Sequence, residues 1–182
     1  MKQAKKVANN TTILYVQMML TVTASLYITR LLLLELGEEN FGVFNLILGT
    51  IGLFSFLNAA MTTSSQRFMS YATGQDIIVK QKNIFNTSIV LHLFIGIVVV
   101  VLLEILGYFT FDYLFNIPEN KIDIAKVVYQ FLIINAFFSV ISVPYDAVIN
   151  ARENMFFVAV LKIIQTLLLL ASAFYITFSQ YN

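Results

Sequence analysis

The feature that most constrains this chain is a set of long stretches that contain no charged residue. Five of them are 23, 27, 21, 19 and 20 residues long, and they cover residues 7–29, 40–66, 83–103, 127–145 and 163–182. An α-helix needs about 20 mostly apolar residues to cross a hydrocarbon layer about 30 Å thick. Each stretch is therefore long enough for one transmembrane helix.

The composition of the 182 residues points the same way. Hydrophobic residues make up 59% of the chain and charged residues 12%, whereas a soluble domain carries about 25% charged residues. This balance excludes a soluble globular protein and a disordered chain. The net charge is only +1, and no basic stripe is available to neutralise phosphates, so no nucleic-acid partner is expected. The predicted fold class is an all-α integral membrane protein.

We expect residues 1–182 to form a single transmembrane domain with five membrane spans. Gly37 and Gly74 are the predicted helix ends, since glycine tolerates the backbone conformations that stop a helix. The first apolar run is too long for the core of a signal peptide, so it is interpreted as a retained span. The predicted spans cover residues of about 11–36, 41–61, 84–109, 127–149 and 155–178.

The basic residues predict how these spans are oriented. The connecting segments on one side of the membrane hold 8 Lys and Arg residues, and those on the other side hold 3. The positive-inside rule then places the N-terminus in the cytoplasm. An odd number of spans and an abrupt end after the fifth suggest an N-terminal fragment of a longer protein.

Polar residues recur at helical spacing within three of the predicted spans. In the first span, Gln17 begins a stripe that repeats every four residues, and in the fourth span a stripe ends with Asp146. Lipid offers these groups no hydrogen bonds, so the stripes should face protein or water. The three stripes are Gln17, Thr21, Ser25 and Thr29; Gly42, Asn45, Gly49, Gly52 and Ser55; and Asn135, Ser139, Ser142, Asp146 and Asn150. Close helix packing is favoured for the second stripe, whereas the fourth-span stripe fits packing or an aqueous cavity equally well. Pro144, within the fourth span, predicts a kink.

Three sets of ionisable residues have two interpretations each. Arg30 either extends to the outer headgroups or lies in a cavity and holds an anionic substrate group, with Glu104 as its natural partner. Arg67 and Arg152 lead an inner basic group that contacts anionic lipid or gathers a lipid-linked phosphate, because guanidinium forks match phosphate oxygens. His92, the single histidine, is interpreted as a packed or interfacial residue rather than a proton relay.

Several kinds of chemistry lack the residues they need. The chain has no cysteine and one histidine, so neither a metal site nor a cofactor is expected. It also has no nucleotide-binding phosphate loop, no H-E-x-x-H and no G-x-S-x-G motif. Nothing in the sequence supports an enzyme.

Three segments resemble bacterial polysaccharide flippases of the multidrug/oligosaccharidyl-lipid/polysaccharide exporter superfamily. Thr29–Gly37 with Phe41 and Gly42 is similar to their first-span exit and outer turn. Phe54–Met61 with Ser64–Ser70 is similar to their second span and the segment after it, and Val143–Met155 to their fourth-span exit. The order and spacing of these segments carry the resemblance over essentially the whole chain.

The resemblance implies about 12 to 14 spans in two lobes of about six, of which this chain would supply most of the first. It implies a transporter of the bacterial inner membrane that flips an undecaprenyl-pyrophosphate-linked oligosaccharide to the periplasmic leaflet in O-antigen or capsule (lipopolysaccharide) biosynthesis. Its partners would be membrane lipids, the missing second lobe and polysaccharide assembly proteins. The expected substrate-binding residues are Arg30, Arg67, Gln17, Asp146 and Arg152. The alternatives are a drug or cation antiporter of the same superfamily and a truncated, non-transporting membrane chain.

Overall fold

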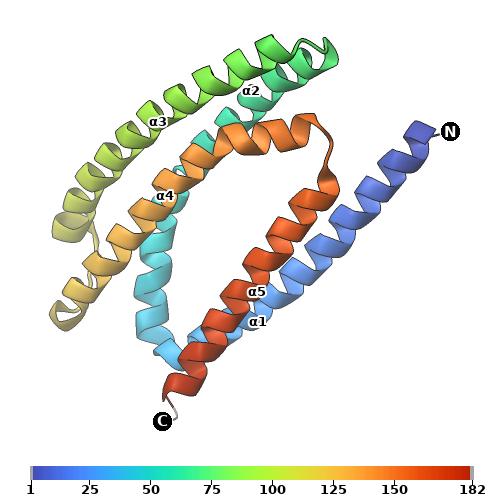
Figure 1. Ribbon diagram of the computed structural model, residues 1–182. Helices are drawn as coiled ribbons and strands as arrows, with labels where there is room; N and C mark the ends of the chain where they lie inside the picture. Colours follow the sequence, from blue (N-terminus) through green and yellow to red (C-terminus); the bar gives the residue numbers. More distant parts are fainter. Residues whose placement is uncertain (1, 181–182) are drawn as a thin grey trace. The chain divides into compact units, whose positions relative to one another are not determined.

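The computed structural model describes residues 2–180, and within that range it contains helices and no strand. Figure 1 shows the helices joined by short connections. Their bounds are α1 Lys2–Gly52, α2 Ser55–Gly74, α3 Ile78–Phe109, the π-helical turn η1 Thr110–Leu114, the 3-10 turn η2 Glu119–Lys121, α4 Ile122–Ala151 and α5 Met155–Gln180. The predicted all-α fold class is confirmed.

The chain divides into two compact units that are described separately. The central unit is Gly42–Arg152, which holds the last part of α1 together with α2, α3 and α4. The terminal unit combines Met1–Phe41 with Glu153–Asn182, and so contains the first part of α1 and all of α5. The boundary between the units therefore falls within α1.

Both predicted glycine breaks coincide with changes in the helices. Gly37 interrupts α1 with a φ of 73°, a left-handed conformation in which a residue with a Cβ is strained. Gly74 is the last residue of α2, and Asp76 in the following turn takes a φ of 55°. The first break bends the chain within a long helix, and the second separates α2 from α3.

Within the described residues, four helices are long and apolar enough to cross a membrane. They are Val7–Gly74, Ile78–Tyr113, Glu119–Ala151 and Met155–Phe178. The first has 68 residues, about 100 Å of helix at 1.5 Å per residue, which is far more than one crossing needs. It also contains the Gly37 kink, and a division at this kink would give two spans. The total of five membrane spans stays a prediction.

The helices extend beyond the predicted spans at the charged ends. We expected the third span to begin near residue 84 and the fourth near residue 127, but α3 begins at Ile78 and α4 at Ile122. The added turns carry Lys80 and Lys82 in α3 and Asp123 in α4. A charge marks the edge of the hydrocarbon layer, whereas the backbone hydrogen bonds of a helix continue into the headgroup region.

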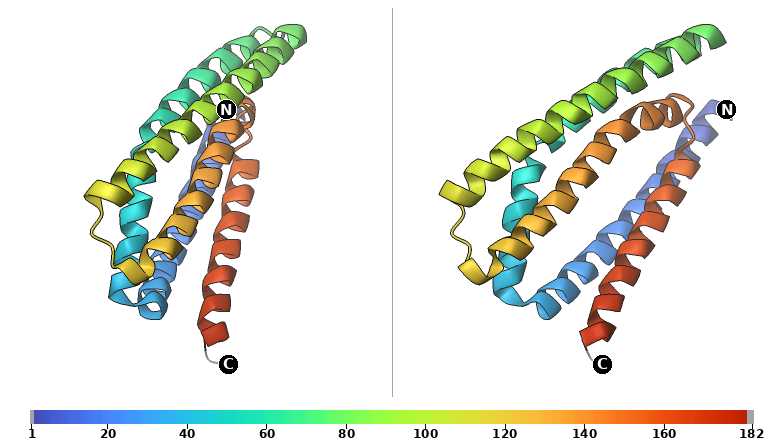
Figure 2. Two further views of the ribbon diagram at one scale, coloured as in Figure 1. Left: turned by 90° about the vertical axis from the view of Figure 1, so that its left-hand side faces the viewer. Right: turned by 60° about the vertical axis from the view of Figure 1, so that its left-hand side comes forward.

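In the central unit, α4 packs against both α2 and α3, and Figure 2 shows α2 and α3 running side by side. Two glycines of α3 make the close contact with α4: a Cβ at Gly96 would lie 3.0 Å from the Phe137 ring, and one at Gly107 would clash with Tyr129. The buried core of the unit includes Ile47, Val99, Leu103, Tyr129 and Ile133.

The expectation that the second-span stripe marks close packing is wrong for its glycines. A Cβ built at Gly42, Gly49 or Gly52 would meet nothing within 4 Å beyond its chain neighbours and the backbone of its own helix turn. The small residues that allow close approach are instead in α3, which shows no polar stripe in the sequence. Small size alone therefore did not identify the packed helix face.

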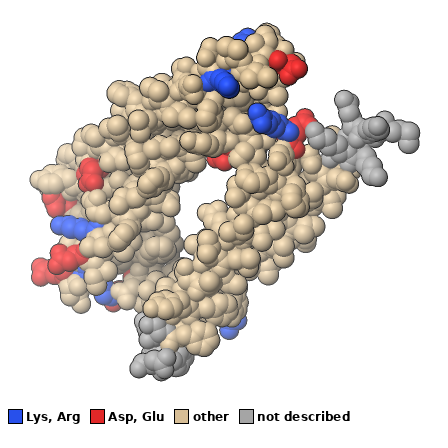
Figure 3. Space-filling model, in the orientation of Figure 1, with Lys and Arg blue, Asp and Glu red and all other residues tan. Residues whose placement is uncertain are grey.

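The surface of the central unit is mostly uncharged and apolar. Figure 3 shows that its Lys, Arg, Asp and Glu side chains gather near the α2–α3 turn and near the α3–α4 connection, with an uncharged band between them. Large apolar side chains of α3 and α4 are exposed, among them Phe94 at 66% and Phe131 at 68%. An apolar belt between two charged rims is what a lipid bilayer requires of a protein surface.

In the terminal unit, a ring contact and a hydrogen bond connect α1 to the segment that contains α5. The centre of the Tyr27 ring of α1 lies 5.9 Å from the centre of the Phe174 ring of α5. Asn10 Nδ2 donates a hydrogen bond to the Glu153 carbonyl at 3.4 Å, and Asn154 Oδ1 accepts one from the Phe157 backbone N–H at 3.3 Å at the start of α5. Most apolar side chains of α5 are exposed.

Candidate functional site

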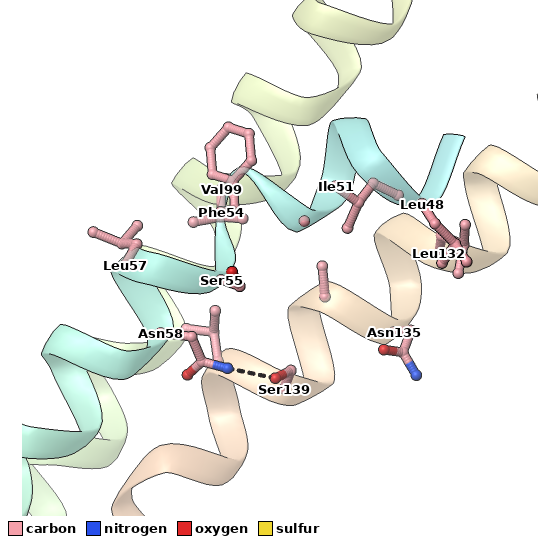
Figure 4. Close-up of a pocket in the computed structure, with 13 residues that line it drawn as sticks. Leu48, Ile51, Phe54, Ser55, Leu57, Asn58, Val99, Leu132, Asn135 and Ser139 are labelled. Atoms are coloured by element: carbon pink, nitrogen blue, oxygen red, sulfur yellow. Dashed lines mark hydrogen bonds between the residues drawn. The ribbon is translucent and has the colours of Figure 1, made fainter. Parts of the chain in front are cut away.

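A polar cavity of about 240 Å³ lies inside the central unit, between the end of α1, the beginning of α2 and the middle of α4. Figure 4 shows these helices around it. Its polar lining consists of Ser55, Asn58, Asn135 and Ser139, and none of its lining residues is ionisable. The remaining lining residues are Leu48, Ile51, Gly52, Phe54, Leu57, Val99, Leu132, Ala136 and Val140.

A local change in helix geometry shapes one wall of the cavity. At the junction of α1 and α2, the Phe54 N–H donates to the Ile51 carbonyl at 3.0 Å, and the Leu57 N–H donates to the Phe54 carbonyl at 3.1 Å. Hydrogen bonds at a spacing of three residues tighten a helix into a 3-10 turn, which often marks a hinge when it interrupts a long helix. Ser55 and Asn58 follow this turn directly and line the cavity.

One hydrogen bond crosses the cavity wall from α2 to α4. Asn58 Nδ2 donates to Ser139 Oγ at 2.6 Å, as the dashed line in Figure 4 marks. The two residues are 81 positions apart in the sequence. In an apolar environment such a bond connects two helices that otherwise have only van der Waals contacts.

The same amide leaves one polar atom without a partner. Asn58 Oδ1 is buried and accepts no hydrogen bond from any described residue. If the amide is turned over, the nitrogen takes the unpaired position instead, so one of its two ends is unsatisfied in either orientation. A buried polar atom without a hydrogen bond is costly, and the adjoining cavity is large enough to hold water or a ligand hydroxyl that would pair with it.

The α4 side of the cavity comes from the polar stripe that the sequence singled out. Asn135 and Ser139 are four residues apart, one helical turn, and both line the cavity. Ser142 Oγ donates to the Ser139 carbonyl at 2.8 Å, while Asp146 lies further along α4 and outside the cavity lining. Pro144 is buried, and α4 continues through it as one helix from Ile122 to Ala151.

The two predicted site residues of the first span lie in the terminal unit. Gln17 is buried, at 8% exposure, and its Nε2 donates to Thr21 Oγ1 at 2.8 Å within the predicted stripe. Arg30 is exposed. Its expected partner Glu104 belongs to the central unit, where Glu104 Oε2 accepts a hydrogen bond from Gln130 at 3.2 Å. The pairing of Arg30 with Glu104 stays a prediction.

The other three predicted site residues lie in the central unit, outside the polar cavity. Arg67 on α2 and Asp146 on α4 are both exposed. Arg152, directly after α4, lines a second pocket of about 310 Å³ together with Lys82 of α3. Arg152 therefore shares a pocket with Lys82, another member of the inner basic group. Their role in substrate binding stays a prediction.

His92 is a packed residue, as interpreted from the sequence. It is 3% exposed, and its Nδ1 lies 2.7 Å from the Ser88 carbonyl oxygen of its own helix. Its Nε2 lies 3.5 Å from Ser65 Oγ on α2. A proton on Nδ1 would be donated to the carbonyl and would leave Nε2 to accept from the Ser65 hydroxyl, so the ring joins α2 to α3. Among the described residues, no group of three His, Asp or Glu side chains could hold a metal.

Asn58 is the cavity residue that our reading of the sequence missed. The second-span stripe ended at Ser55, yet Asn58 follows three residues later on the same helical face and continues the spacing. An amide in a predicted span, one turn after a hydroxyl, is the signal that identifies it. We missed it because the stripe was attributed to packing by small residues.

Comparison with known proteins assigns this chain to a family. No curated protein and no solved structure matches it. A family model described as MatE matches residues 15–176, which is most of the chain and includes the whole central unit with the polar cavity. Members of that family are transporters rather than enzymes. This chain therefore belongs to the MatE family, the membrane transporters of the multidrug/oligosaccharidyl-lipid/polysaccharide exporter superfamily.

Proposed function

We propose that this chain belongs to the part of a flippase that moves an undecaprenyl-pyrophosphate-linked oligosaccharide from the cytoplasmic to the periplasmic leaflet. The observation that carries the proposal is the uncharged hydrogen-bonding wall of the cavity, formed by Ser55, Asn58, Asn135 and Ser139. Amides and hydroxyls both donate and accept hydrogen bonds, as sugar hydroxyls do. A neutral wall of this kind suits a sugar better than a cation.

The physical task of such a protein explains why this wall is needed. A sugar headgroup cannot cross hydrocarbon alone, because each hydroxyl would lose its hydrogen bonds at a cost of several kcal/mol, about 4 to 8 on a cyclohexane scale. The unpaired end of the Asn58 amide is a hydrogen-bonding group already placed in the apolar interior. The lipid tail can remain in the bilayer while the headgroup is transferred between hydrogen-bonding groups of the protein.

The charged residues would act on the pyrophosphate. We assign Arg67 and Arg152 to gathering the phosphate at the cytoplasmic leaflet, because arginine forks bind phosphate oxygens in pairs. Arg30 would neutralise the headgroup in transit, and Gln17 with Asp146 would bind its hydroxyls. Alternating exposure of the substrate would require the second lobe that the resemblance implies, with the chain in a bacterial inner membrane and its N-terminus in the cytoplasm.

Deletion and complementation of the full-length gene test this function. Cells without it should lose surface polysaccharide and accumulate the lipid-linked oligosaccharide, and Asn58→Leu with Asn135→Leu in the restored copy should leave most of that defect in place. Thr166→Val is the matched control, because the Thr166 hydroxyl donates to the Lys162 carbonyl of its own helix. Normal surface polysaccharide in the deleted strain would refute the proposal.

A drug or cation antiporter is the second candidate, and one observation favours it. Glu104 and Gln130 line a groove between α3 and α4 whose other lining residues are apolar. A carboxylate at that depth is a candidate site for a cation or a proton. Greater sensitivity of the deleted strain to cationic drugs, together with a normal surface polysaccharide, would support this candidate. The same sensitivity in a strain carrying Glu104→Gln would assign it to this carboxylate.

A further inference from the structure

A second pocket of the central unit combines apolar walls with two basic side chains. It has a volume of about 310 Å³ and lies where the α2–α3 turn meets the end of α4. Its basic members are Lys82 of α3 and Arg152 at the end of α4, and none of its lining residues is acidic. Met69, Ile78, Phe85, Val148 and Ile149 supply the apolar lining, and Gln81 and Tyr145 complete it.

The two cations are available to a ligand. Both side chains are exposed, and the pocket lining contains no Asp or Glu that would neutralise them. Lys80, two residues from Lys82, behaves differently: its Nζ donates to Gln75 Oε1 at 2.8 Å and lies 4.9 Å from the centre of the Tyr71 ring. The structure thus engages one lysine of this helix end internally and leaves the other at the pocket.

The apolar part of the pocket is a trough whose lining side chains are held by contacts with one another and with α2. The Phe85 and Tyr145 rings pack edge to face, with their centres 5.3 Å apart, and form one wall. Met69, at 3% exposure, is the most buried lining residue. Gln81 Nε2 donates to the Ala72 carbonyl at 3.4 Å, which holds that side chain toward α2. The volume is at the lower end of small-molecule sites, about 300 to 1,000 Å³, enough for one phosphate and the first part of one chain.

We infer that this pocket binds an anionic phospholipid of the leaflet that faces the α2–α3 turn. Lys82 and Arg152 bind the lipid phosphate. Tyr145 is 51% exposed, and its hydroxyl donates a hydrogen bond to the headgroup. One acyl chain lies along the Phe85 side of the trough. Basic pockets between transmembrane helices on the cytoplasmic side are where anionic headgroups bind, and our predicted orientation places this end in the cytoplasm. The site shares Arg152 with the proposed function but does not rest on it, since any lipid phosphate fits the same charges.

Lipid titration of the purified protein in a neutral detergent, followed by native mass spectrometry, tests this inference. Phosphatidylglycerol should bind more tightly than phosphatidylcholine with the same acyl chains. Lys82→Gln and Arg152→Gln should each weaken phosphatidylglycerol binding about fivefold, and the double variant should bind the two lipids alike. Lys80→Gln should bind as the unmodified protein does, because that lysine is engaged elsewhere.

Two further ligands identify the source of the phosphate. Inorganic phosphate should compete only weakly, because it cannot fill the trough, and Val148→Phe should weaken phosphatidylglycerol binding by narrowing it. Stronger binding of undecaprenyl phosphate than of phosphatidylglycerol would overturn the inference in favour of a substrate entry site. Unchanged phosphatidylglycerol binding in the double variant, with normal elution on size exclusion, would remove the site altogether.

Discussion

The two units of this chain use similarly apolar sequences in different ways. In the central unit, 22% of the residues in the most apolar 18-residue stretch of α3 are buried, and the share in α4 is the same. In α5 of the terminal unit, only 6% of the residues in the corresponding stretch are buried. Leu103 of α3 is 0% exposed, while Leu168 of α5 is 64% exposed. Hydropathy alone therefore identifies a helix that enters the membrane but does not predict whether protein or lipid covers its side chains.

The difference between the units comes from small residues and polar contacts rather than from hydrophobicity. Lipid tails are as apolar as leucine, so helices in a membrane associate where their backbones approach closely or where polar groups pair. The central unit has both, with Gly96 and Gly107 against the aromatic rings of α4 and Asn58 bonded to Ser139. Among the described residues of the terminal unit, the Tyr27 ring of α1 contacts the Phe174 ring of α5, and Asn10 donates a hydrogen bond to the Glu153 carbonyl just before α5.

Truncation of one leucine in each unit gives the largest expected effect. Leu103→Ala leaves a cavity in the central core and should lower the free energy of unfolding by about 3 kcal/mol. Leu168→Ala removes the same atoms from an exposed position and should change it by less than about 0.5 kcal/mol. Denaturation in mixed micelles, followed by circular dichroism, measures both. Equal losses would show that α5 is packed as tightly as α3.

Removal of one tyrosine hydroxyl in each unit gives a smaller effect. Tyr129 is 2% exposed, and its hydroxyl donates to the Leu103 carbonyl at 2.6 Å, so Tyr129→Phe should cost about 1 kcal/mol. Tyr175 of α5 is 74% exposed, and Tyr175→Phe should leave the stability unchanged. The melting temperature in detergent provides the comparison, and a loss for Tyr175→Phe as large as that for Tyr129→Phe would contradict it.

The elements that local chemistry determines could be predicted from the sequence. The kink at Gly37 and the end of α2 at Gly74 were expected because glycine tolerates the conformations that interrupt a helix. The stripe that contains Asn135 and Ser139 was recognised as a candidate cavity wall, since its spacing places both residues on one helix face. These features depend only on residues within a few turns of one another.

The features that depend on how helices meet could not be predicted. The partner of Ser139 is 81 residues away, and no local spacing shows that α2 lies against α4. The same limit made us assign close packing to the glycines of the second span rather than to Gly96 and Gly107, whose neighbours Phe137 and Tyr129 come from α4. Helix pairing determines which small residue is a contact and which faces open space.

The smallest expected effect is the difference in coupling free energy between a hydrogen bond that joins two helices and one that lies within a single helix. Asn58 and Ser139 join α2 to α4, whereas Gln17 and Thr21, whose side chains are 2.8 Å apart, lie one turn apart on α1. A double-mutant cycle with Asn58→Leu and Ser139→Ala should give a coupling of about 0.6 kcal/mol, the usual value for a hydrogen bond between membrane helices. Gln17→Leu and Thr21→Val should give a coupling near zero, because the α1 helix and its internal bond persist in the detergent-unfolded state. A coupling at Gln17 as large as that at Asn58 would mean that Gln17 also stabilises tertiary structure, and the contrast between the two units would then be one of degree.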